Sequence, residues 1–243
     1  MRIEVVLAAV AASTLVPGGS AVAGTDPKEA RLGDMKADRV LFLGNSITLH
    51  GPAAHIGWSG NWGMAASASE KDYVHLLLRR IAEATGRKPE AMIENIAEFE
   101  RNYGTYNVGA ALKKPLEFNA DLVVVAIGEN VPAFPSEEAK KKFRSAFASL
   151  LAALRGRGKP AILVRSCFWP DRNRDEIMRE VCREAGGTFV DISGLARDES
   201  HSARAEREFA HAGVAAHPGD KGMKAIADAI WKAIEGRVSP SGR

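Results

Sequence analysis

Short apolar segments alternate with amphipathic segments along the chain, and this alternation restricts the fold more than any other feature. The apolar segments lie at residues 39–44, 90–96, 121–127, 160–166 and 188–192. Most of them are continuous runs, as expected for parallel strands whose sheet is covered by helices on both faces. We therefore predict an α/β fold in which five parallel strands form a doubly wound, three-layer sandwich.

The intervening segments have apolar residues at helical spacing. Four helices are expected: one that ends at Gly86, one that begins at Ser136, one over residues 172–185, and one from about Asp220 to Glu235. Ser67 and Glu70 form an S-x-x-E capping box for the first helix, whereas Ser136 and Asp220 are the expected caps of the second and fourth. The chain shows no repeat and no internal linker, so we expect a single domain.

The N-terminal segment has the features of a secretory signal peptide. A basic residue, Arg2, precedes an apolar stretch at 5–16 that is too short to span a bilayer, and an A-x-A cleavage site ends at Ala23. We therefore expect the mature protein to be secreted or periplasmic. The expected division of the chain is a signal peptide at 1–23, a lead-in at 24–38, one domain at 39–236 and a flexible tail at 237–243.

Charge and composition argue against several classes of function. The formal net charge is only +3 and basic residues are scattered, so we expect no nucleic-acid partner. No other apolar run reaches membrane length, and we expect no stable membrane insertion. The histidines lack zinc-ligand spacing and no nucleotide-binding glycine motif occurs, so neither a metal nor a cofactor is expected. The spacing of Cys167 and Cys182, from a strand end into the following helix, predicts free thiols.

Three short polar signals fall where predicted strands end or the last helix begins. Ser46 closes a Gly-Asn-Ser turn after the first strand, Asn130 closes Gly-Glu-Asn after the third, and His217 precedes the last helix. Open α/β sheets bind ligands at the carboxyl ends of their strands. When a serine hydroxyl lies within hydrogen-bond reach of a histidine, the serine can act as a nucleophile and the histidine as its base. The order of these residues therefore indicates a hydrolase.

The same segments resemble the SGNH, or GDSL-type, hydrolase family of esterases and acetylesterases, from Arg39 to the final helix. Gly-Asn-Ser-Ile-Thr is similar to the first block of the family, Ala-Ile-Gly-Glu-Asn to the third, and His-Pro-Gly-Asp-Lys-Gly-Met to the last. The resemblance implies a flavodoxin-like sandwich with Ser46 as nucleophile and His217 as base. It also implies an oxyanion hole formed by the Ser46 backbone N–H and the Asn130 side-chain amide.

Two positions depart from the pattern of the family. The family usually carries Asp three residues before the histidine, where this chain has Val214. His217 is then oriented either by a backbone carbonyl or by a carboxylate from elsewhere, for which the candidates are Glu206, Glu208, Asp191 and Glu129. The stretch that matches the second block, residues 95–101, has no Gly to supply a further oxyanion donor.

Further residues near these signals are candidates for substrate binding: Asn45, Trp58, Trp62, Glu98, Glu100 and Arg101. The two tryptophans lie in a long Gly-rich loop, residues 49–66, where they either stack on a sugar ring or pack the loop itself. The charged residues at 98–101 either face the substrate or begin a solvated helix.

Together the patterns predict an exported serine esterase, without a cofactor, that hydrolyses a small carboxylic ester through an acyl-enzyme on Ser46. Export, the tryptophan pair and the polar loops favour O-acetyl groups on carbohydrate as the substrate. Two alternatives stay open at this point: a non-catalytic carbohydrate-binding protein on the same fold, and an O-acyltransferase. The sequence indicates neither the acyl chain nor the oligomeric state.

Overall fold

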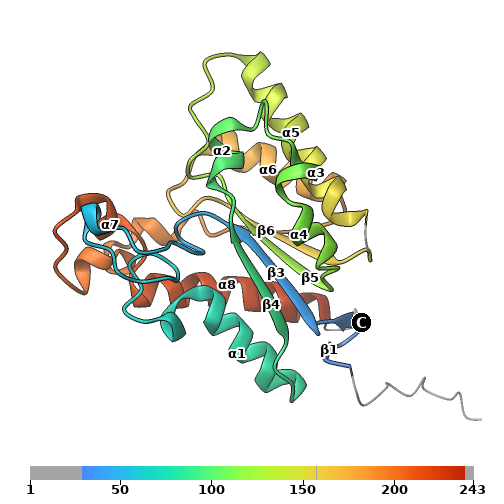
Figure 1. The fold of residues 1–243 in the computed structure, drawn as a ribbon, viewed down its shortest axis with the longest axis horizontal. Helices are drawn as coiled ribbons and strands as arrows, with labels where there is room; N and C mark the ends of the chain where they lie inside the picture. The colour runs from blue at the N-terminus through green and yellow to red at the C-terminus, as the bar shows by residue number, and fades with distance from the viewer. Residues whose placement is uncertain (1–28, 157, 239–243) are drawn as a thin grey trace, which may run out of the picture.

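The computed structural model describes residues 29–156 and 158–238 and has the predicted three-layer α/β/α architecture (Figure 1). A parallel sheet of five strands in the order β4-β3-β5-β6-β7 forms its central layer. The strands are β3 (Arg39–Gly44), β4 (Glu90–Asn95), β5 (Leu122–Ala126), β6 (Ala161–Arg165) and β7 (Thr188–Val190). When these five strands are numbered in chain order from β3, this is the 2-1-3-4-5 order of a flavodoxin-like fold, so the predicted fold class is confirmed.

Four long helices cover the two faces of the sheet. They are α1 (Tyr73–Thr85) and α8 (Asp220–Val238) on one face, and α5 (Glu137–Arg155) and α6 (Arg172–Glu184) on the other. Alternate residues of each strand face opposite layers. In β3, Val40 and Phe42 pack with α1 and α8, whereas Leu41 and Leu43 pack with α5 and α6. Both faces of this strand are therefore buried, which explains its continuous apolar run.

Two regions contain elements that the sequence patterns did not predict. A small antiparallel hairpin precedes β3, and three short helices connect β4 to β5. These elements are β1 (Arg31–Leu32), β2 (Met35–Lys36), α2 (Ala97–Asn102), α3 (Val108–Ala111) and α4 (Lys113–Glu117). Each of them is too short to show a periodic apolar pattern, which needs a window of about 11–18 residues.

The Gly-rich loop at residues 49–66 and a second long loop, the polar stretch at residues 194–216, pack against each other at the carboxyl edge of the sheet. Trp58 and Met64 of the first loop form one apolar cluster with Ala203 and Val214 of the second. Short helical turns organise both loops and the start of α1: η1 (Ala54–Ile56), η2 (Ser69–Lys71), η3 (Leu195–Arg197), η4 (Glu199–His201), η5 (Ala203–Ala205) and α7 (Ala212–Ala216). Residues that are distant in sequence are thereby brought together above the sheet.

The predicted capping box of α1 is wrong. Asp72 caps this helix, because its carboxylate accepts a hydrogen bond of 2.8 Å from the backbone N–H of His75. The same buried carboxylate accepts the N–H of Gly63 at 3.0 Å and so ties the first long loop to the helix. Ser67 lies before the 3₁₀ turn η2, too far from the first turn of α1 to cap it.

The predicted cap of α8 is also wrong. Asp220 is the first residue of α8, and its carboxylate accepts hydrogen bonds from the backbone N–H and the hydroxyl of Ser67. Glu206 takes the capping role instead, since its carboxylate accepts the backbone N–H groups of Asp220 and Lys221, both at 2.7 Å. The cap predicted at Ser136 is confirmed.

Cys167 and Cys182 are free and buried, as predicted. Burial raises the pKa of the Cys182 thiol to about 11. No helix among the described residues is both long enough and apolar enough to cross a membrane. The predicted signal peptide, residues 1–23, lies outside the described residues.

Substitution of Asp72 by Ala is expected to lower the free energy of unfolding by about 2–4 kcal/mol, as measured by urea denaturation. The loss combines a helix cap, typically about 1 kcal/mol, with the unsatisfied buried N–H of Gly63, about 1–3 kcal/mol. Ser67→Ala is the control, and it should change the stability by less than about 1 kcal/mol because its contacts are exposed. Equal losses in the two variants would contradict the capping assignment.

Candidate active site

The three residues predicted to carry the chemistry line one cavity of about 430 Å³ at the carboxyl edge of the sheet. Ser46 follows β3 by two residues, Asn130 lies in the loop after β5, and His217 lies just before α8. Parallel strands place all their carboxyl ends at the same edge. The topology therefore brings together residues that are separated by up to 171 positions in sequence.

Ser46 and His217 form a hydrogen-bonded pair. The Oγ atom of Ser46 lies 2.8 Å from Nε2 of His217, and Nδ1 of His217 lies 2.7 Å from the carbonyl oxygen of Gly213. A carbonyl oxygen only accepts hydrogen bonds, so Nδ1 carries the proton and donates a hydrogen bond to the carbonyl oxygen of Gly213. Nε2 is then free to accept the serine hydroxyl hydrogen, which is the arrangement that a general base requires.

The imidazole of His217 is held in its neutral form. Burial lowers the pKa of His217 below its ordinary value, because desolvation disfavours the charged ring. The hydrogen bond to Gly213 and the negative charge of Glu129 oppose this shift without cancelling it. His217 can therefore accept a proton at neutral pH.

The partner of His217 Nδ1 is the backbone carbonyl of Gly213. A carboxylate was the alternative considered from the sequence. No carboxylate pairs with His217 among residues 29–156 and 158–238. The four candidates lie elsewhere: Glu206 caps α8, Asp191 binds Ser193 and Arg179, Glu129 binds Arg165, and Glu208 is exposed. Of the two arrangements considered from the sequence, the contacts favour orientation by the backbone.

Glu100 positions the side-chain amide of Asn130. Its Oε2 atom accepts from Nδ2 of Asn130 at 2.7 Å, and its Oε1 atom accepts from the backbone N–H groups of Asn130 and Gly128 at 3.1 and 2.6 Å. The amide of Asn130 keeps a second hydrogen for a ligand in the cavity. The backbone N–H of Ser46 donates to no acceptor within the described part of the chain. Two N–H donors are thus available beside the Ser46 hydroxyl.

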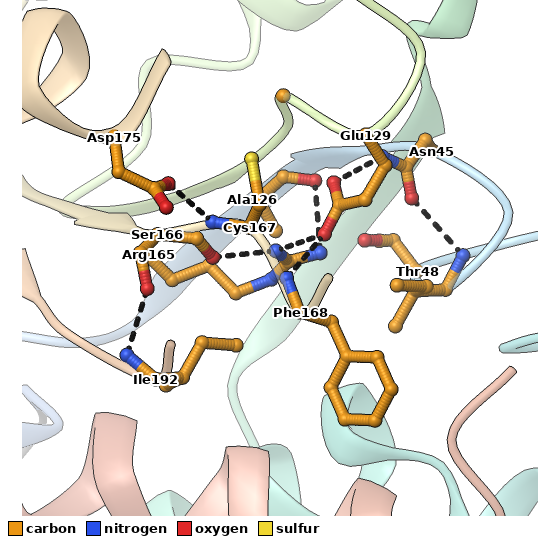
Figure 2. Close-up of polar contacts among 12 residues, drawn as sticks. Asn45, Thr48, Ala126, Glu129, Arg165, Ser166, Cys167, Phe168, Asp175 and Ile192 are labelled. Atoms are coloured by element: carbon orange, nitrogen blue, oxygen red, sulfur yellow. Dashed lines mark hydrogen bonds and ion pairs between the residues drawn. The ribbon is translucent and has the colours of Figure 1, made fainter. Parts of the chain in front are cut away.

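A buried ion pair joins Glu129, next to Asn130 in the chain, to Arg165 at the end of β6, and Figure 2 shows its two side chains with their polar contacts. Nη1 of Arg165 donates to Oε1 of Glu129 at 2.6 Å, and the two side chains are 0% and 4% exposed. Glu129 also accepts from Nδ2 of Asn45 at 2.7 Å and from the backbone N–H of Phe168 at 2.8 Å. Burial raises the pKa of Glu129, but Arg165 and these donors outweigh burial and hold it below its ordinary value.

Asn45 and Glu100 were predicted to contact substrate, and the structure corrects this prediction. Both are completely buried, and Nδ2 of Asn45 lies 3.2 Å from Oε1 of Glu100. Burial, together with the negative charge of Glu129, raises the pKa of Glu100. Asn45 therefore links the turn that carries Ser46 to both carboxylates, and its role is to hold this turn.

Gly128 meets a steric requirement of the loop that carries Asn130. Its φ angle is 125°, a conformation that side-chain-bearing residues rarely adopt. A Cβ atom at this position would lie 2.5 Å from Sγ of Cys167. Only glycine allows the backbone of this loop to approach β6 and to donate its N–H to Glu100.

The two predicted aromatic ligands pack inside the first loop. Trp58 is 7% exposed and donates its indole N–H to the carbonyl of His50, and Trp62 donates to the carbonyl of Ala66. Their rings meet edge to face with centroids 5.6 Å apart, and neither residue lines the cavity. These contacts favour the alternative of plain packing for the two tryptophans.

Glu98 and Arg101, in the first and last turns of α2, do line the cavity. Both are exposed, and Nη2 of Arg101 lies 3.4 Å from Oδ1 of Asn130. The N–H of Ala97, which also lines the cavity, donates to Oδ1 of Asn95 at 2.9 Å. The second-block segment thus contributes charged side chains to the cavity wall.

Sequence reasoning missed three residues near the Ser46–His217 pair. His50 and His211 line the cavity, and Trp169 packs edge to face on the His217 ring with centroids 5.3 Å apart. Trp169 follows β6 at the same carboxyl edge as Ser46. Its position shortly after a predicted strand could therefore have identified it from the sequence. The two histidines carry no such signal, because folding of the long loops brings them to the cavity.

Comparison with protein families identifies the chain. The model of the GDSL-like lipase/acylhydrolase family matches residues 42–225, well over half of the sequence. The chain belongs to this family. The matched residues include Ser46, Asn130 and His217. A search of curated proteins finds no match to the sequence.

Solved structures share the fold at low sequence identity. A two-domain esterase active on acetylated mannans, co-crystallised with mannopentaose, matches 84% of this chain with a TM-score of 0.58 and 16% identity. This chain spans only 51% of that protein. A GDSL-like lipase structure from Bacteroides uniformis gives a TM-score of 0.53 at 14% identity, and the match covers 82% of this chain and 96% of that one. An acetyl xylan esterase gives 0.50 at 16% identity, with 80% and 98% covered.

Substitution of Arg165 by Met is expected to lower the free energy of unfolding by about 3–5 kcal/mol, because it leaves the buried Glu129 without its cation. Urea denaturation measures this loss. The double variant Glu129→Gln/Arg165→Met should recover part of it, since no unpaired charge remains. Arg172→Met, which removes an exposed ion pair with Glu176, is the control and should leave the unfolding midpoint unchanged. An equally small effect of Arg165→Met would contradict the prediction.

Proposed function

We propose that this protein is a serine esterase that hydrolyses a small carboxylic ester through an acyl-enzyme on Ser46. The observation that carries the proposal is the contact chain from Ser46 Oγ to His217 Nε2 and from His217 Nδ1 to the Gly213 carbonyl, at the wall of a cavity. Membership of the GDSL-like lipase/acylhydrolase family supports this chemistry. A purely binding protein has no need for a serine hydroxyl aligned on a neutral imidazole.

In the acylation step, His217 takes the hydroxyl proton while Oγ of Ser46 attacks the ester carbonyl. The carbonyl oxygen becomes an oxyanion, for which the Ser46 N–H and the Asn130 amide are the donors. Loss of one such donor typically costs about 3–4 kcal/mol of the barrier. His217 then gives its proton to the leaving alcohol as the tetrahedral intermediate collapses to the acyl-enzyme.

In the deacylation step, water replaces the alcohol. His217 removes a proton from this water as its oxygen attacks the acyl carbonyl, and the same two N–H donors stabilise the second oxyanion. The proton returns to Oγ of Ser46 when the carboxylic acid leaves. The Gly213 carbonyl holds Nδ1–H throughout and stabilises the imidazolium, which a carboxylate would stabilise more strongly.

For the substrate, we propose O-acetyl groups on carbohydrate. Esterases of acetylated mannan and xylan share the fold of this chain, and the cavity wall carries the polar side chains Glu98 and Arg101 for sugar hydroxyls. The predicted signal peptide agrees with a secreted or periplasmic enzyme that meets such polymers. An O-acyltransferase would use the same acyl-enzyme, and competition between water and added alcohols distinguishes it.

Ser46→Ala and His217→Ala are each expected to lower kcat/KM for p-nitrophenyl acetate by about 10⁴-fold or more, because nucleophile and base act as a unit. The mature protein from Gly24 is the reference, and circular dichroism establishes that the variants are folded. Ser200→Ala, at a half-buried serine of η4 that donates to Asp198 and does not line the cavity, is the control and should retain activity. Turnover that survives in Ser46→Ala would exclude the proposed mechanism.

The pH profile of kcat/KM should rise to a plateau with a midpoint below about 6.5, the ordinary pKa of histidine. The neutral imidazole is the active form, so activity is lost as the pH falls through the lowered pKa of His217. Initial rates with p-nitrophenyl acetate between pH 4.5 and about 8 measure the midpoint, and circular dichroism at each pH excludes unfolding. A midpoint at or above about 6.5 would contradict burial as the dominant influence on this ring.

A further inference from the structure

Trp169 is the one large apolar side chain that is exposed among the described residues, at 37%. It lies in the connection between β6 and α6, and its ring stands edge to face on both Phe168 and His217, with centroids 5.5 and 5.3 Å away. An exposed indole costs free energy in water, since apolar surface is left unburied. Contact with two rings leaves part of the indole free to contact a ligand.

A second hollow, of about 230 Å³, is lined by Trp169 and shares no lining residue with the catalytic cavity. Its wall combines Trp169 and Phe168 with polar residues of η4 and its neighbours, among them Glu199, Ser202 and Arg204. This volume is below the range of about 300–1,000 Å³ that is usual for drug-sized ligands. The hollow is therefore large enough for one sugar ring but too small for several linked sugar rings.

Several hydrogen-bonding groups at this hollow are unused. Within residues 29–156 and 158–238, no hydrogen bond or ion pair involves the guanidinium of Arg204, the carboxylate of Glu199 or the indole N–H of Trp169. The wall thus offers two kinds of donor and one acceptor around an aromatic ring. Asp198, whose carboxylate already accepts from Ser200, also lines the hollow. The presence of both signs of charge at Asp198, Glu199 and Arg204 favours an uncharged polyhydroxylated ligand over an ion.

The position of the hollow relates it to the leaving group. His217 Nε2 faces the Ser46 hydroxyl and would deliver the proton to the leaving alcohol, and Trp169 packs against the same imidazole. A saccharide whose esterified oxygen lies at His217 therefore continues past the indole. In the sheet, β6 lies on the opposite side of β3 from β4, and β4 is followed by α2, whose residues Glu98 and Arg101 line the first cavity.

We propose that the hollow at Trp169 is a subsite for a neutral pyranose ring adjacent to the esterified sugar, with the indole as its stacking platform and Glu199 and Arg204 as its hydroxyl ligands. This inference rests on the proposed esterase function. It assigns Trp169 to substrate recognition, and it predicts a preference for oligosaccharide esters over monosaccharide esters. Aromatic contacts are worth about 0.5–1.5 kcal/mol beyond area burial, which corresponds to roughly a tenfold effect at the upper end.

The test compares kcat/KM on acetylated mannopentaose, acetylated xylopentaose, acetylated methyl mannoside and p-nitrophenyl acetate. The native enzyme should prefer at least one pentasaccharide over the monosaccharide by about tenfold, and Trp169→Ala should abolish this preference mainly through KM. Trp169→Phe should restore part of it. With p-nitrophenyl acetate the loss in Trp169→Ala should be clearly smaller than with the pentasaccharide, because no sugar enters the hollow and only the contact of Trp169 with the His217 ring is removed.

A second pair of variants separates the subsite from support of His217. Arg204→Ala should weaken the pentasaccharide preference, whereas Arg197→Ala, an equally exposed arginine outside the hollow, should not. An equal loss on all substrates in Trp169→Ala would overturn the proposal, because Trp169 would then only support the imidazole. A native enzyme that ignores chain length would overturn it as well.

Failure of the esterase function itself is a distinct result. If native protein hydrolyses no ester, calorimetric titration of Ser46→Ala with mannopentaose and with xylopentaose still tests the subsite. Binding that is lost in Ser46→Ala/Trp169→Ala supports the subsite, and absence of binding to both sugars overturns it.

Discussion

The ion pair between Glu129 and Arg165 is the interaction on which the organisation of the catalytic edge depends. It lies at the carboxyl ends of β5 and β6, it is almost completely shielded from water, and its geometry leaves a carboxylate oxygen for Asn45. Removal of two charges from water is costly, and close pairing with further hydrogen bonds is what offsets the cost. Through Asn45 this pair holds the turn of Ser46, and through Phe168 it holds the segment that carries Trp169. One buried charge pair thus sets the relative positions of three strand ends.

Glu100 extends this network toward the cavity and pairs with no cation in the part of the chain that the structure describes. It gathers N–H groups from Gly128, Asn130 and Asn45, so that the loop after β5 and the turn after β3 converge on one carboxylate. Because Glu129 lies close and Arg165 neutralises only one of the two acids, the pKa values of the pair move apart. A carboxyl group that is buried, multiply hydrogen-bonded and raised in pKa is suited to hold an amide donor in place.

Local patterns predicted most of the fold because each pattern reports burial directly. The strand β3 is buried on both faces, and its sequence is a continuous apolar run. The residue that caps α5 and the apolar residues on its buried face lie directly before or within the helix itself. The real cap of α1, Asp72, lies directly before the helix and was overlooked because Ser67 and Glu70 matched the capping-box pattern. The cap of α8 was predicted wrongly because its real partner comes from outside the local pattern. Glu206 reaches α8 from a loop 14 residues away, and Ser67 bonds a carboxylate 153 residues away. No local spacing encodes such contacts.

The sequence by itself determined the fold class, the placement of Ser46, Asn130 and His217 at one edge, and the absence of a carboxylate three residues before the histidine. These follow from periodicity and from the rule that parallel strands end on the same side. Only the tertiary structure decided that a backbone carbonyl orients His217, that Asn45 and Glu100 are buried, and that Trp169 rather than Trp58 or Trp62 is exposed. Those properties depend on which loops pack against each other, and loop packing is set by contacts between residues far apart in the chain.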